Sequence, residues 1–99
     1  MAIVEISVTP LGIEKMGVSE YVAGCLELVR DSGLSYQLTP MGTIIEGEAD
    51  VLFPLLQKMH ESPFMAGVKR VSTLIKIDDR RDRKHSMQGK VASVLTKLD

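Results

Sequence analysis

The chain has 99 residues, a net charge of −1, and a composition that is 44% hydrophobic and 25% charged, which is ordinary for a soluble globular protein. A chain of this length forms one domain around a single core, so we expect residues 1–99 to be one unit. The small net charge argues against a nucleic-acid partner, because such proteins concentrate positive charge.

The first half of the chain predicts two strands that flank a helix, and then a third strand. Residues 3–9 alternate between apolar and polar side chains, as a strand with one buried face does. Apolar residues at three- and four-residue steps then predict an amphipathic helix, which stops at Gly33. Residues 34–39 alternate again, and a tight turn leads from them into a strand over 43–48.

The third strand carries two carboxylates, Glu46 and Glu48. Because strand side chains alternate, we expect these two on one face of the sheet and Thr43, Ile45 and Gly47 on the other. Two acids on one sheet face indicate a face that meets water, a partner chain or a cationic ligand. As an acid/base pair they are poorly placed, because such pairs usually come from different elements.

The second half predicts a helix, a strand and a last helix. Asp50 can cap a helix that Ser62-Pro63 breaks or restarts and that Gly67 ends. Residues 69–78 alternate as a fourth strand. Ser86 can cap a final helix, which carries an apolar stripe.

This order, β-α-β-β-α-β with an added C-terminal helix, predicts an α+β fold. Right-handed crossovers turn it into a ferredoxin-like plait, in which a four-stranded antiparallel sheet has both main helices on one face. The first and third strands are then central neighbours. We therefore expect Glu5 and Ser7 to lie beside Glu46 and Glu48 on the open face of the sheet. The extra helix must cover a sheet edge, another helix or another subunit, which favours a homo-oligomer.

Several other functions lack their motifs. The central strands have no aromatic residues for stacking RNA bases, and the loop after the first strand has neither a Cys-x-x-Cys pair nor an arginine for phosphate. The only cysteine, Cys25, falls in an apolar stripe and reads as core. We expect no catalytic residue and no metal site, and we read the charged loop 80–85 as solvated and largely self-neutralised.

The hydropathy of the sequence and its first residues give an expectation for the location of the protein in the cell. No run approaches the roughly 20 apolar residues that a membrane-spanning helix needs. The sequence enters a strand directly, without a segment like a signal peptide. We therefore expect a cytoplasmic protein with no membrane partner.

Five short segments, in this order and spacing, resemble the small thiamine-binding protein family, which is related to hydroxymethylpyrimidine/thiamine-binding proteins with duplicated plaits. The resemblance spans essentially the whole chain. The segments are Val8-Thr9-Pro10-Leu11-Gly12, Ser32-Gly33-Leu34-Ser35-Tyr36, Pro40-Met41-Gly42-Thr43, Glu46-Gly47-Glu48 and Lys76-Ile77-Asp78-Asp79-Arg80.

The resemblance implies a plait whose sheets pair into dimers or tetramers and which binds thiamine, or its hydroxymethylpyrimidine moiety, without catalysis and without another cofactor. A carboxylate such as Glu46 can accept from the amine of an aminopyrimidine. Ser7, Thr9 and Thr43 are candidate polar contacts, and Tyr36 could pack against a ring. We expect Glu48 to be structural, with Lys76 as a candidate partner.

The location of the site stays open at this stage: the sheet face, a cleft between helices and sheet, or a subunit interface. The alternatives are a ligand-sensing or assembly module of the same fold for another small ligand, and an enzyme that uses the acidic sheet face.

Overall fold

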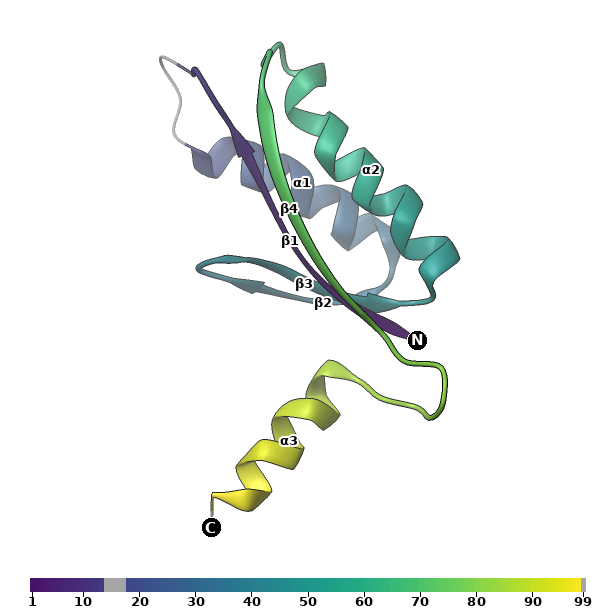
Figure 1. Ribbon diagram of the computed structural model, residues 1–99. Coiled ribbons are helices and arrows are strands. Elements are labelled where there is room, and N and C mark those ends of the chain that lie inside the picture. The colour runs from purple at the N-terminus through teal and green to yellow at the C-terminus, as the bar shows by residue number, and fades with distance from the viewer. Residues whose placement is uncertain (14–17, 99) are drawn as a thin grey trace.

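The computed structural model describes residues 1–13 and 18–98, and it has the predicted order of elements (Figure 1). The predicted boundaries are close to those observed, although the third strand ends one residue earlier than expected. The elements are β1 Ala2–Pro10, α1 Val18–Ser32, β2 Ser35–Thr39, β3 Gly42–Gly47, α2 Ala49–Met65, β4 Val71–Asp79 and α3 Met87–Lys97.

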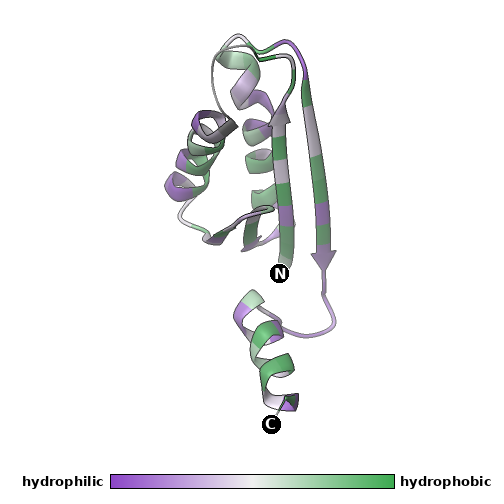
Figure 2. Ribbon diagram, turned by 90° about the vertical axis from the view of Figure 1, so that its left-hand side faces the viewer, coloured by the Kyte–Doolittle hydropathy of each residue, from purple (hydrophilic) through white to green (hydrophobic). Residues whose placement is uncertain are grey.

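The four strands form one antiparallel sheet in the order β2-β3-β1-β4. Helices α1 and α2 lie together on one side of this sheet (Figures 1 and 2). The arrangement is the predicted ferredoxin-like plait, with β1 and β3 as central neighbours.

The core lies between the sheet and the two helices. Alternate residues of β1, including Val4 and Ile6, are fully buried together with Ile45 of β3. They pack against apolar residues of α1 and α2, such as Val29 and Leu56. Burial of each such side chain stabilises the fold by about 1.5–3 kcal/mol.

Helix α2 is continuous through Pro63, so the predicted break at Ser62-Pro63 is wrong. A proline inside a helix has no N–H for the carbonyl four residues earlier, which here is that of Met59. The Cys25 thiol of α1 donates to this carbonyl at 3.3 Å. The bond from Cys25 therefore satisfies a buried acceptor that would otherwise favour a break.

Glu48 does not belong to β3, which corrects the prediction of two acids paired on one strand. Its carbonyl accepts from the N–H groups of Val51 and Leu52 at 3.0 and 2.9 Å, so its backbone already serves the first turn of α2. Its carboxylate lies 3.9 Å from the amino group of Met1. The predicted partner, Lys76, instead stands opposite Glu5.

The register also corrects the expected neighbours of Glu46. Ile3 of β1 stands opposite Glu46, and Ser7 lies four residues further along that strand, a distance of about 13 Å. Glu5 stands opposite Ile44 rather than beside the acid. These polar residues share a face of the sheet, as predicted, but they do not form one acidic cluster.

Helix α3 begins as predicted, since the Ser86 side chain accepts from the N–H of Gly89 at 3.0 Å. A second acceptor comes from the sheet, because Glu46 Oε2 accepts from the N–H of Met87 at 2.9 Å. From this point the helix projects away from the sheet (Figure 1). None of the residues Met87–Lys97 is buried.

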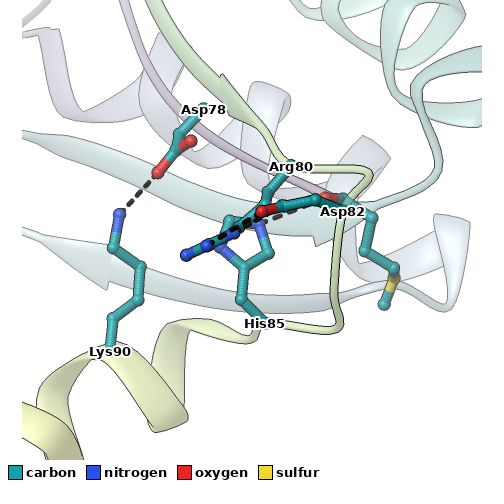
Figure 3. A network of polar contacts seen from close by, with 6 residues as sticks. Asp78, Arg80, Asp82, His85 and Lys90 are labelled. Carbon is teal, nitrogen blue, oxygen red and sulfur yellow. Dashed lines mark hydrogen bonds and ion pairs between the residues drawn. The ribbon is translucent and has the colours of Figure 1, made fainter.

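The segment between β4 and α3 is tied together by ion pairs (Figure 3). Arg80 pairs with Asp82 at 2.6 Å, and Lys90 of α3 pairs with Asp78 at 2.6 Å. The bond from Arg80 lowers the pKa of Asp82 to about 2, and the bond from Lys90 lowers the pKa of Asp78. These carboxylates are therefore charged at neutral pH, in agreement with a loop that neutralises itself.

The substitution Gly42→Ala should destabilise the fold, because a Cβ at this position would lie 2.8 Å from the Ile6 carbonyl oxygen. We expect a loss of about 1–3 kcal/mol in the free energy of unfolding, measured by urea denaturation. Gly24→Ala is the matched control, since its Cβ would meet only the Ser62 hydroxyl at 3.5 Å within α1. Equal stability of the two variants would contradict the close contact at Gly42.

The substitution Glu46→Ala should loosen the start of α3, because it removes the acceptor for the Met87 N–H. Loss of such a cap costs about 0.5–2 kcal/mol, so amide exchange in α3 should accelerate roughly 2- to 30-fold. Glu46→Gln keeps an acceptor oxygen and should exchange nearly as slowly as the wild type. Identical exchange in both variants would show that this bond does not hold the helix.

Candidate functional site

A cavity of about 200 Å³ lies where the β2–β3 hairpin turns away from β1, beneath α1 and α2. Strand β1 contributes one wall, the hairpin another, and the two helices close it from their side of the sheet. Its lining residues are Ile6, Ser7, Val8, Thr9, Val22, Cys25, Leu38, Thr39, Pro40, Met41, Gly42, Thr43 and Met59.

The cavity exists because β1 extends beyond the point where its pairing with β3 ends. That pairing ends at Ile6–Thr43, whereas pairing with β4 continues to Pro10. Main-chain groups of alternate residues in an antiparallel strand face the same neighbour. The Ile6 carbonyl faces Gly42 of β3, and so the N–H and C=O of Val8 face the same side, which here is the cavity.

The described residues that line the cavity are uncharged. Burial raises the pKa of the Cys25 thiol, despite an opposing hydrogen bond from Ser62, so this group is neutral at neutral pH. The Thr39 hydroxyl is committed to the hairpin turn, where it accepts from Met41 and Gly42 and donates to the Gly42 carbonyl at 2.8 Å. Thr43 is buried, with 6% of its surface exposed.

The cavity brings together three of the five residues proposed from the sequence: Ser7, Thr9 and Thr43. Thr43 stands opposite Ile6, and both belong to the side of the sheet that faces the helices. Ser7 and Thr9 border the cavity from the part of β1 that runs past the end of β3. The cavity lies at the cleft between sheet and helices, one of the three open locations. Of the three residues only Thr43 belongs to the helix-facing side, because Ser7 and Thr9 alternate with Ile6 and Val8 and border the cavity from the open face.

Glu46 and Tyr36 are not among the lining residues. Glu46 lies on the open face and accepts from the first N–H of α3, so its predicted role toward a ligand stays a prediction. Tyr36 stands opposite Ile45 on the outer strand β2, and 39% of its surface is exposed.

Sequence reasoning missed the apolar walls of the cavity. Cys25 and Met59 read as core residues of two helices, and Leu38 and Met41 as parts of a strand and a turn. A signal for them was present in Gly42, because a glycine directly after a tight turn allows close approach to a neighbouring strand. The alternation of residues within one strand cannot show that its pairing with one neighbouring strand ends before its pairing with the other.

The metal-ligand residue types in the described part of the chain do not cluster into a metal centre. Within residues 1–13 and 18–98, no group of three His, Cys, Asp or Glu side chains could hold a metal ion. His60 is half-buried and its Nδ1 lies 2.7 Å from the Thr73 hydroxyl. No helix in the described part of the chain has the length and apolar character needed to cross a membrane.

Comparison with known proteins places the chain in a family. It is 45% identical over 98 residues to the UPF0045 protein YqgV of Bacillus subtilis, covering 95% of this chain and 94% of that protein. It is 38% identical over 99 residues to a UPF0045 protein of Methanothermobacter thermautotrophicus, covering 99% of this chain and all of that one.

Solved structures of similar proteins have the same fold as this chain. A hypothetical protein of Methanocaldococcus jannaschii, MJ1052, matches with a TM-score of 0.83 and 30% identity over 94% of both chains. A Thermotoga maritima protein, named for a proposed role in thiamine biosynthesis or salvage, shares the fold with a TM-score of 0.78 and 22% identity, covering 94% of this chain and 97% of that one. The family model described as thiamine-binding protein matches residues 4–95, and the chain therefore belongs to the thiamine-binding protein family.

Proposed function

We propose that this protein is a non-catalytic, cytoplasmic, homo-oligomeric single-domain protein that binds thiamine through its hydroxymethylpyrimidine moiety. The observation that carries this proposal is the small uncharged cavity between sheet and helices, with a hydroxyl at Thr43 and a strand edge at Val8. Membership of the thiamine-binding protein family supports the choice of ligand.

Size and charge favour the pyrimidine ring over the rest of the ligand. A cavity of about 200 Å³ is smaller than the roughly 300–1,000 Å³ that holds a drug-sized molecule, so it suits one substituted ring. The thiazolium ring of thiamine carries a permanent positive charge, and burying it without a counter-charge is costly. We infer that the pyrimidine enters and the thiazolium stays at the water-exposed mouth.

The polar groups of the cavity fit the edge of an aminopyrimidine. Its exocyclic amine is a donor and the adjacent ring nitrogen is an acceptor. The C=O of Val8 can accept from the amine, and the N–H of Val8 or the hydroxyl of Thr43 can donate to the nitrogen. The apolar walls formed by residues such as Cys25, Leu38 and Met59 would pack on the faces of the ring.

The lining also supports binding rather than chemistry. General acid–base catalysis needs a titratable group within hydrogen-bond reach of the reacting atom. The lining residues described in the structure offer one titratable side chain, Cys25, whose pKa is raised by burial. The acidic pair that suggested an enzyme is divided between the start of α3 and the start of α2.

Thiamine should raise the melting temperature, because a ligand that binds only the folded state stabilises it by mass action. At 100 times Kd the gain is about 2.7 kcal/mol, and each kcal/mol corresponds to about 4–8 °C for a domain of this size. Hydroxymethylpyrimidine should also raise the melting temperature, whereas the isolated thiazole alcohol should not. No shift with millimolar thiamine or hydroxymethylpyrimidine would reject the ligand, and a shift with the thiazole alone would reject the orientation.

The substitution Thr43→Val should weaken binding of hydroxymethylpyrimidine, measured by isothermal titration calorimetry. Valine keeps the shape but removes the hydroxyl, and losing a buried hydrogen bond costs about 1–3 kcal/mol, or roughly 5- to 150-fold in Kd. Thr96→Val, on the exposed surface of α3, makes the same chemical change away from the cavity and should bind normally.

The substitution Glu46→Gln tests whether the ligand binds in the cavity or at the Glu46 carboxylate proposed from the sequence. Glutamine can still accept from the Met87 N–H, so a change in affinity would report on the charge and not on the position of α3. Normal affinity in Glu46→Gln with weak binding in Thr43→Val supports the cavity. The opposite pattern would move the site to the open face of the sheet.

A further inference from the structure

Helix α3 presents an apolar stripe that its own domain does not cover. Val91, Val94, Leu95 and Leu98 are each more than half exposed. Their spacing places them on one face of the helix. Figure 2 shows hydrophobic residues on this helix, which stands apart from the sheet and from α1 and α2.

A second uncovered apolar surface lies between α2 and β4. It is a groove of about 550 Å³ whose lining includes Phe53, Pro54, Leu56 and Ile75. Phe53 is 57% exposed and Ile75 is 43% exposed, although Ile75 belongs to the face of β4 that pairs with the core side of β1. The helix layer therefore leaves the outer strand of the sheet incompletely covered.

The polar groups inside this groove are already satisfied. His60 Nδ1 and the Thr73 hydroxyl lie 2.7 Å apart, and the His60 ring packs edge-on against Phe64 with centroids at 5.5 Å. An apolar occupant could therefore cover the groove without leaving these two side chains unpaired. The open face of the sheet is less suitable, because Glu5 and Lys76 stand at its centre.

The chain's own α3 is held away from the groove. Its first turn is fixed at the end of the sheet by the Met87–Glu46 bond at 2.9 Å and the Lys90–Asp78 ion pair at 2.6 Å. The preceding His85 Nε2 lies 3.1 Å from the Met1 carbonyl oxygen (Figure 3). Folding back would break these contacts, which favours an occupant from another molecule over α3 of the same chain.

Charge favours a second copy as that molecule. Asp50 and Glu61 are exposed and share the face of α2 that carries Phe53 and Gln57, because the other three positions follow Asp50 at helical spacings of three, seven and eleven residues. The described residues of α3 carry no acid and two lysines, of which Lys90 pairs with Asp78 and Lys97 lies beside the apolar stripe. Lys97 on the helix and the two acids of α2 beside the groove carry opposite charge, which favours this pairing and its register.

The geometry points to α3 of one copy lying in the α2–β4 groove of a second copy, with the reverse contact formed at the same time. A two-fold axis makes these two contacts equivalent and closes the assembly. This inference rests on the homo-oligomeric part of the proposed function and does not depend on the ligand.

Cysteine cross-linking tests the pairing directly. Val94→Cys in one tagged form would be co-expressed with Ile75→Cys in a form of different size, and the oxidised product separated on a non-reducing gel. Cys25 is buried and should not compete. Leu74→Cys replaces Ile75→Cys in the matched control, because Leu74 is its sequence neighbour on the open face of the sheet.

A mixed-size disulfide with Ile75→Cys, and none with Leu74→Cys, is the expected result. A stronger product with Leu74→Cys would place α3 on the open sheet face, and no mixed product with either would remove the contact; both overturn the inference. A chain that carries both Val94→Cys and Ile75→Cys and forms only an intrachain disulfide would show that α3 docks on its own domain. That result would overturn the inference as well.

Mass measured by light scattering gives an independent readout. Leu95→Asp should lower the mass of the assembly toward that of the monomer, whereas Thr96→Asp, on the opposite side of α3, should leave it unchanged. An unchanged mass for Leu95→Asp would contradict the docking. Because thiamine binding is measured separately, its loss or survival in Leu95→Asp does not affect this conclusion.

Discussion

The unequal pairing of the central strand β1 is the constraint on which the candidate site depends. β1 pairs with β4 as far as Pro10 but with β3 only as far as Ile6. Gly42 permits this geometry, because any larger residue would meet the Ile6 carbonyl as the hairpin turns away. The divergence leaves a hollow under the helices and directs the main chain of Val8 into it. A plait with equal pairing on both sides of β1 would fill this space with strand.

Much of the fold could be predicted from the sequence, because alternation and helical spacing are local signals. They gave the order of the elements, the side of the sheet on which Val4 and Ile45 lie, and the cap at Ser86. Pro63 was misread because its effect depends on a distant side chain. The acceptor that it frees on Met59 is satisfied by Cys25 from another helix, and no local pattern contains that contact.

The candidate site could be predicted in part, for a related reason. Ser7, Thr9 and Thr43 were proposed as polar residues on the central strands, and they do line one cavity. The carboxylates were proposed because charged residues are easy to identify in a sequence. The register of the strands, and the residue at which the pairing of two strands ends, cannot be identified in this way. The Glu46 carboxylate accepts from the first N–H of α3, whereas Glu48 serves the first turn of α2 through its main-chain carbonyl. A carboxylate on a sheet face can therefore serve the end of a helix.

The hydrogen bond from Cys25 to the Met59 carbonyl joins three positions into one unit. The thiol is needed there because Pro63 cannot supply its own N–H. In relatives with another residue in place of this proline, the helix would satisfy the carbonyl itself, and the pressure to keep a donor at the cysteine position would disappear. Cys25 and Pro63 should therefore change together during evolution. Since Cys25 and Met59 also form a wall of the cavity, a drift in this pair would alter the shape of the ligand space without any change in its polar contacts.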